Sequence, residues 1–312
     1  MKTAQNKCRE EDVVGLDINS GRLTAAHFAR TEQGMKLDRL VTGDYPPELS
    51  DRQIASRIRA FWKKEKLPGR IVRTCLHSRA LLVRYFQYSN LNTEELGMAL
   101  SLEAEETLQR PAPELCIDWH LNSSAESDLS KLTGTLVAAP RKTVRRHLDL
   151  IQAAGLYSVN VETSCSALCN CYSFFFGKKE TSPVCLVNLA DRTADIIMRT
   201  ESCIYPRTLF SADEPWETNS DYLLENIQNA LLYYHLKIKQ GPVERVVLIG
   251  KIPAPQHFPG KLERKVSLPV EVLDVCSHPD IGIEKQKLPT SGNCNIATAI
   301  GLALREFGDE PV

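Results

Sequence analysis

Apolar and polar positions alternate near the start of the chain in a way that predicts a β-hairpin. In VVGLDINSGRLTAAHF (residues 13–28), an apolar run ends at Asp17, a polar turn follows at 19–21, and apolar residues then return at alternate positions. Two such runs joined by a short turn that contains Asn and Gly are typical of a hairpin. The carboxylate at the strand end has two interpretations: a turn residue that accepts backbone hydrogen bonds, or part of a phosphate or metal site.

The pattern up to residue 183 then changes repeatedly between the strand period and the helix period. Apolar residues at helical spacing predict helices at 50–68, 92–108 and 140–155, and a Cys-, Ala- and Phe-rich helix after Glu162. Short apolar runs predict strands at 36–43, 71–77, 80–87, 115–121, 131–139 and 158–162. Strands mixed with helices along the whole chain indicate the α/β class.

At residue 184 the hairpin pattern begins again. VCLVNLADRTADIIMR (184–199) has the same strand–turn–strand character as the first hairpin, and Asn188 falls where Asp17 stands. The second half continues with a long helix at 219–241, strands at 244–251 and 270–275, and a closing helix at 295–308. This long-range repeat suggests two related lobes.

Composition narrows the function classes. The chain has 312 residues, of which 43% are hydrophobic and 25% charged, as in a soluble globular protein. The net charge of -1 provides no global basic field for nucleic acid, and no apolar run approaches the roughly 20 residues that span a bilayer. The polar start MKTAQNKCREED has no apolar signal core, so we expect a cytoplasmic protein without direct membrane insertion.

Ten cysteines require a separate interpretation. Several stand in apolar segments, where a buried free thiol is the usual state. The one close group, Cys165, Cys169 and Cys171, contains no CxxC pair and no nearby histidine. We therefore expect free thiols in a reducing compartment and no structural metal, with a metal site at this group as the alternative.

The chain resembles the actin-like superfamily, which includes actin, heat-shock chaperones, sugar kinases and FtsA. The features that carry this resemblance are the hairpin at 13–28, its copy at 184–199 and the strand VVLIG at 246–250. The resemblance implies that the two hairpins hold the phosphates of ATP with Mg²⁺, and that a later glycine pair meets the adenosine. It also makes Glu162, in VNVETSCSAL, the candidate for positioning an attacking water.

A narrower resemblance is to the type IV pilus assembly protein PilM family, which is related to FtsA. The residues that carry it are VVGLDINSGRL, VRTCLHSRALLVRYFQYSNLNTEELGMALSLEAEETL, LVAAPRKTVRRHLDLIQAAGL with VNVE, and NIATAIGLALREFG. It implies an actin-like (ribonuclease H-like) two-lobe fold. We expect a first lobe at 12–183, a second lobe at 184–312, and an inserted subdomain of the FtsA and PilM type at about 71–150.

The same resemblance implies a scaffold of a type IV pilus or a related secretion platform. Such a protein docks to the N-terminal tail of a PilN-like inner-membrane protein, stays peripheral to the membrane and binds no nucleic acid; self-association is a further expectation. We expect the tail to lie in a groove between the insertion and the first lobe and to extend a sheet edge. Arg79, Arg84 and Tyr85 are the candidate contacts.

The sequence departs from the superfamily pattern at all three nucleotide contacts. The candidate nucleotide-binding residues are Asp17 (also the Mg²⁺ candidate), Asn19, Ser20, Gly21, Arg22, Asn188, Ala190, Asp191, Thr193, Gly250 and Lys251. Asn19 and Ala190 stand in place of glycines, and Asn188 in place of an aspartate. Lys251 replaces the second glycine of the adenosine strand. Asparagine carries no charge for Mg²⁺, and alanine resists positive φ. Two hypotheses stay open: a scaffold with a degenerate ATP cleft, or an active ATPase or kinase.

Overall fold

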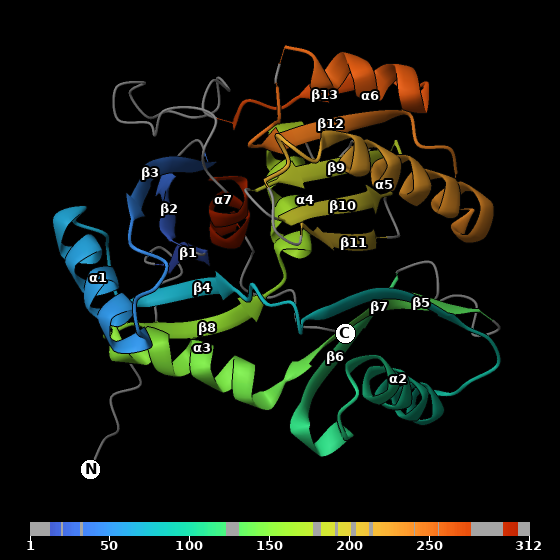
Figure 1. Cartoon of the computed structure of the whole chain (residues 1–312). Helices are drawn as coiled ribbons and strands as arrows, with labels where there is room; N and C mark the ends of the chain where they lie inside the picture. The colour runs from blue at the N-terminus through green and yellow to red at the C-terminus, as the bar shows by residue number, and fades with distance from the viewer. Residues whose placement is uncertain are drawn as a thin grey trace.

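The computed structural model of the chain describes residues 13–19, 21–31, 34–122, 131–176, 182–190, 193–200, 204–211, 215–239, 241–254, 256–275 and 296–304. Its strands form two five-stranded sheets and a smaller three-stranded sheet, with helices packed against each of them (Figure 1). No helix in these ranges is long and apolar enough to cross a bilayer. The predicted α/β class is confirmed.

The first sheet contains both strands of the N-terminal hairpin. Its order is β3-β2-β1-β4-β8, with β1 at Val13–Asn19, β2 at Arg22–Thr31, β3 at Gly34–Asp44, β4 at Ile71–Cys75 and β8 at Tyr157–Glu162. Helices α1 (Asp51–Lys64) and α3 (Arg141–Ala153) cover one face, and α7 (Ile296–Leu304) packs against the other. Val14 and Leu16 point toward α1, whereas Gly15 lets α7 approach, because a Cβ there would overlap the backbone of Ala299.

The second sheet holds the repeated hairpin. Its order is β11-β10-β9-β12-β13, with β9 at Val184–Leu189, β10 at Thr193–Arg199, β11 at Ile204–Phe210, β12 at Arg245–Gly250 and β13 at Val270–Val272. One face packs against α4 (Ser164–Phe176), and the other against α5 (Ser220–Tyr233), its π-helical extension η4 (Tyr234–Ile238) and α6 (Phe258–Val266). The sequence analysis missed β11. This strand carries Pro206 and lies at the sheet edge, where a missing backbone donor is tolerated.

The third sheet forms a small subdomain beside the two larger sheets (Figure 1). Its order is β5-β7-β6, and its elements are β5 (Leu82–Tyr88), α2 (Thr93–Leu108), the 3-10 turn η2 (Ala112–Glu114), β6 (Leu115–Leu121) and β7 (Leu132–Pro140). Helix α2 begins at a capping box, because the Asn92 side chain accepts from the N–H of Glu95 while the Glu95 carboxylate accepts from the N–H of Asn92. These reciprocal bonds set the start of the helix that covers the small sheet.

The small sheet occupies less of the chain than the inserted subdomain expected at about 71–150. Strand β4 pairs in parallel with β1 and with β8 inside the first sheet, and α3 packs mainly against α1 and β8. The subdomain therefore runs from β5 to β7. The sequence of a short apolar strand does not show which sheet the strand joins, so the run at 71–77 was compatible with both the first sheet and the small sheet.

Two helices cross between the halves of the chain. Helix α7 comes from the second half but packs on β1 and β2, while α4 comes from the first half and packs on β10. The two helices also pack against each other, and their buried residues join both large sheets in one core cluster. A division of the chain at 183/184 therefore separates the strands of the large sheets but not the helices that cover them.

Candidate functional site

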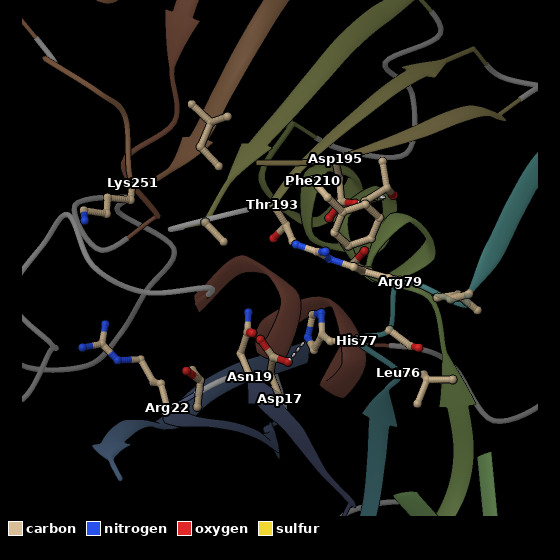
Figure 2. A pocket seen from close by; sticks show the side chains of 18 of the residues that line it. Asp17, Asn19, Arg22, Leu76, His77, Arg79, Thr193, Asp195, Phe210 and Lys251 are labelled. Atoms are coloured by element: carbon tan, nitrogen blue, oxygen red, sulfur yellow. Dashed lines mark hydrogen bonds and ion pairs between the residues drawn. The ribbon is translucent and has the colours of Figure 1, made fainter. Parts of the chain in front are cut away.

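A cavity of about 680 Å³ lies where the two hairpins face each other. Figure 2 shows side chains from both large sheets around it. Among the predicted nucleotide-binding residues, those that line the cavity are Asp17, Asn19, Gly21, Arg22, Ala190, Thr193 and Lys251. Asn188 and Gly250 are not in its lining, and Ser20 and Asp191 lie outside the described residues. The cavity is thus built largely from the residues that the hairpin pattern singled out.

Asp17 is the most buried acid of the cavity, with a relative exposure of 1%. Because β1 and β4 are parallel neighbours, their carboxyl ends meet at the same sheet edge, and Asp17 lies beside Cys75 and His77. His77 Nε2 lies 2.5 Å from Asp17 Oδ1, and the Cys75 thiol donates to the same oxygen at 3.3 Å. The second oxygen, Oδ2, is buried without a hydrogen-bond partner in the described part of the chain.

The charges of this trio are coupled. Burial by itself lowers the pKa of His77. The charge of Asp17 and the hydrogen bond to it together raise that pKa by more than burial lowers it, so the pKa lies above its ordinary value. Burial raises the pKa of the Cys75 thiol well above its usual range, and the negative charge of Asp17 adds to the shift. These shifts favour a protonated His77 and a neutral Cys75 thiol beside Asp17.

In the described part of the second hairpin, the carboxyl group that lines the cavity is that of Asp195, and hydrogen bonds hold it. Asn188 is buried at the matching position, and its side chain hydrogen-bonds to Asp195. Thr208 Oγ1 also donates to Asp195 Oδ1 at 2.8 Å. Burial raises the pKa of Asp195 above its ordinary value in spite of these hydrogen bonds, so this carboxyl group is a weaker acid than an exposed one. The backbone N–H of Ala190 donates to the carbonyl of Thr193 at 2.9 Å and closes the turn.

The two cationic side chains among the predicted nucleotide-binding residues form ion pairs with acids. Arg22 Nε lies 2.6 Å from Asp44 Oδ1, and Lys251 Nζ lies 3.0 Å from Glu217 Oε1. Figure 2 shows both side chains at the far side of the cavity from His77. Gly250 has a φ of 86°, and a Cβ there would overlap the carbonyl oxygen of Leu189, so this position requires glycine.

Glu162 does not line the cavity. It ends β8 at 7% relative exposure, and its Oε2 accepts a hydrogen bond from Ser166 Oγ at 3.1 Å. Ser166 belongs to the first turn of α4, where a carboxylate is stabilised by the helix dipole. The geometry gives Glu162 a role at the start of α4, while its predicted role in positioning water stays a prediction.

The three predicted peptide contacts lie in different surroundings. Arg79 lines the cavity, with its guanidinium 5.8 Å from the Phe210 ring centroid, as Figure 2 shows. Arg84 pairs with Glu103 on α2 at 3.1 Å. Tyr85 is buried among second-lobe residues, with its ring 6.1 Å from that of Tyr205. These side chains therefore do not share one groove, because neighbouring residues of a strand point to opposite faces.

A second hollow lies on the subdomain, between α2 and the edge strand β6. Its volume is about 520 Å³, and its lining is Glu94, Gly97, Met98, Ser101, Leu102, Glu105, Ile117 and Trp119. Met98 and Leu102 are 61% and 56% exposed, which is unusual for large apolar side chains that lie together. This groove combines an apolar floor, an acidic rim and the edge strand β6.

Sequence reasoning missed His77 and Asp195 as parts of the cavity, and Cys75 as the buried neighbour of Asp17 behind it. The pattern Cys-x-His at the end of a buried strand was visible, but the partner acid Asp17 is 58 residues away from Cys75. The position of Asp195 in the second hairpin does not correspond to that of Asp17 in the first. Only the antiparallel register, which pairs Asp195 with Asn188, brings it to the same edge.

Comparisons with known proteins agree with this architecture. A family model described as type IV pilus assembly protein PilM matches residues 15–211. The solved structure of a PilM–PilN type IV pilus biogenesis complex is similar with a TM-score of 0.77 and 17% identity over 95% of this chain and 98% of that chain. No curated protein sequence gives a match.

Two further solved structures are more distant. One, from Bacteroides thetaiotaomicron, is described as having an actin-like ATPase fold and unknown function (TM-score 0.53, 9% identity, 87% of this chain and 94% of that chain). The other is the cytoplasmic domain of EpsL, an inner-membrane component of the type II secretion system of Vibrio cholerae (TM-score 0.50, 9% identity, 95% and 96%). Together with the first match, these similarities confirm the predicted actin-like fold.

Proposed function

Because the chain belongs to the family of type IV pilus assembly proteins PilM, we propose that it is a cytoplasmic scaffold that holds the N-terminal tail of a PilN-like inner-membrane protein. In this proposal the cleft between the hairpins does not hydrolyse ATP. The observation that carries the second part is the state of Asp17, whose carboxylate is bound by an imidazole and a thiol of its own lobe.

The residues of the cleft do not fit Mg²⁺. Magnesium prefers octahedral sites of carboxylate oxygens and water. Asp17 offers one oxygen that has no hydrogen-bond partner among the described residues, Asn188 supplies no charge, and the carboxyl group of Asp195 is held by three hydrogen-bond donors. A scaffold tolerates such changes because the apolar framework of both sheets, on which partner surfaces depend, is complete.

The subdomain groove supports the docking part of the proposal. An extended peptide can pair with β6, which is the edge strand of the small sheet among the described residues, and place alternate side chains over Met98 and Leu102. Glu94 and Glu105 on the rim favour basic residues in such a tail. In this proposal the tail lies on the subdomain itself, and not at the junction with the first lobe that the sequence analysis expected.

We expect a synthetic peptide of the PilN-like protein's N-terminal tail to bind the full chain, measured by isothermal titration calorimetry. Met98→Glu and Leu102→Glu should each weaken binding by about tenfold or more, since a charge in an apolar groove is desolvated by the peptide. The matched control is Leu236→Glu, which replaces an equally exposed leucine on η4, far from the groove. It should leave the dissociation constant unchanged.

Two results would contradict this assignment in different ways. Loss of binding in Tyr157→Asp, on the exposed edge strand β8, together with normal binding in Leu102→Glu, would move the site to the first lobe. Absence of binding to the tail by the unaltered chain, with and without nucleotide, would disprove the scaffold proposal.

An active ATPase is the second candidate function, because the cavity is large enough for a nucleotide and contains the guanidinium of Arg79. We expect weak or no binding of Mg-ATP by calorimetry and no steady release of phosphate, for the reasons given for Asn188 and Asp195. Asn188→Asp with Ala190→Gly should restore some magnesium-dependent binding. Steady phosphate release that Asp17→Ala abolishes would instead establish the enzyme.

A further inference from the structure

The floor of the cleft brings together three side chains that are typical ligands of borderline transition metals. Asp17 ends β1, while Cys75 ends β4 and His77 follows it by two residues. Their ligand atoms lie within 4.8 Å of one another. We propose that Asp17, Cys75 and His77 form a binding site for one Zn²⁺-class metal ion, a function independent of peptide docking on the subdomain.

The distances between the ligand atoms are close to those of a tetrahedral site. Bonds of about 2.0–2.3 Å from zinc to oxygen, nitrogen and sulfur place neighbouring ligand atoms roughly 3.3–3.7 Å apart. Cys75 Sγ lies 3.1 Å from His77 Nε2 and 3.3 Å from Asp17 Oδ1. The contact of 2.5 Å between His77 and Asp17 has to open by about 1 Å, because a metal ion would replace the hydrogen that joins them, and the two contacts of the sulfur have to open by a smaller amount.

The buried carboxylate oxygen is an independent sign of a missing ligand. Asp17 Oδ2 is enclosed by protein and has no hydrogen-bond partner among the residues described, although buried polar atoms are normally paired. A cation at the trio would satisfy this oxygen electrostatically. An ion pair with His77 alone leaves it unsatisfied, so the pair does not fully account for the chemistry at this position.

The chemistry of the donors selects the metal. Nitrogen and sulfur ligands suit Zn²⁺ and exclude Mg²⁺, which binds oxygen. Binding would release the proton of the Cys75 thiol, and that of His77 where it is protonated, so the site loads more tightly as pH rises. Asp17 and His77 line the cavity and Cys75 lies behind them, so the fourth position of the ion faces the cavity and is open to water or an anionic ligand.

This proposal departs from the expectation of no structural metal, which rested on the spacing of the group at Cys165, Cys169 and Cys171. Those three thiols lie in the core of α4, and burial raises the pKa of each of them. In the described part of the chain, the group whose ligand atoms all lie within 4.8 Å of one another is Asp17, Cys75 and His77, and not the thiols of α4.

The test uses the reduced full chain after removal of metal by a chelator. We expect one equivalent of Co²⁺, the spectroscopic substitute for Zn²⁺, to bind with tetrahedral visible bands and a thiolate-to-cobalt charge-transfer band. A tenfold excess of Zn²⁺ should bleach these bands, and the same excess of Mg²⁺ should not. Cys75→Ala should remove the charge-transfer band, and His77→Asn should weaken Zn²⁺ affinity by at least about tenfold.

Cys185→Ala is the matched control, since Cys185 is an equally buried thiol on a central strand of the other sheet, and it should bind metal like the unaltered chain. If Cys75→Ala does not fold, His77→Asn decides, because its side chain is 22% exposed. Failure of the unaltered chain to bind one equivalent would overturn the proposal. The proposal would also be overturned if His77→Asn kept the metal affinity and the spectra of the unaltered chain, or if only Cys185→Ala lost metal binding. The peptide titration is unaffected by any of these results.

Discussion

Gly301→Ala is expected to lower the free energy of unfolding by about 3 kcal/mol. Gly301 lies on α7 where this helix touches α4, and a Cβ at this position would overlap the carbonyl oxygen and carbon of Ala167. Both atoms belong to helix backbone, so they cannot rotate away as a side chain would. The two helices must separate, and with them the core that joins the two large sheets.

Gly97→Ala is the matched control for this change. Gly97 is also inside a helix, α2, but a Cβ there has no neighbour within 4 Å. Alanine has the better helix propensity, so this variant should be more stable by roughly 0.5–1 kcal/mol. Urea unfolding followed by circular dichroism measures both. Equal stabilities for the two variants would show that α4 and α7 are not in close backbone contact.

The second large effect is a loss of stability in acid that depends on His147. This residue of α3 lies with Nε2 2.8 Å from Thr74 Oγ1. The pKa of His147 is lowered to about 4. Burial is the largest cause, the positive charge of His77 lowers the pKa as well, and the charge of Asp17 offsets a smaller part of the shift. The folded state therefore holds His147 neutral at a pH where the unfolded chain, with a histidine pKa of about 6.5, is already protonated.

The sign of this effect follows from proton linkage. A lowered histidine pKa means that the unfolded chain binds more protons, so stability is complete above about pH 6.5 and decreases as pH falls toward 4. A difference of about 2.5 pKa units corresponds to about 3 kcal/mol at 1.36 kcal/mol per unit. His77 has the opposite shift, since its raised pKa adds stability at low pH, and only a comparison of variants separates the two.

Urea unfolding at pH 7.5 and at pH 4.5 is the measurement. We expect His147→Gln to lose most of the difference that the unaltered chain shows, because glutamine does not titrate and can still pair with Thr74. His235→Gln, which changes an exposed histidine on η4, should keep the difference. A pH dependence that is the same in His147→Gln and the unaltered chain would refute the assignment.

The sequence alone determined the α/β class, the two hairpins and their long-range repeat. These are local patterns: alternation over a few residues, an Asn- and Gly-containing turn, and helical spacing between caps such as Asn92 and Glu95. The resemblance to the PilM family rests on such local motifs and on their order along the chain. The family model matches residues 15–211, which contain most of these motifs.

The tertiary structure alone decided which segments share a sheet and which side chains share a site. Parallel pairing moved β4 into the first sheet, and with it brought Cys75 and His77 to Asp17. The same pairing shortened the predicted insertion. Such contacts join residues about 60 positions apart, and a strand's composition does not encode its neighbour, so no local pattern contains them. The register of a sheet is a property of the packed chain, and the chemistry of this cleft depends on it.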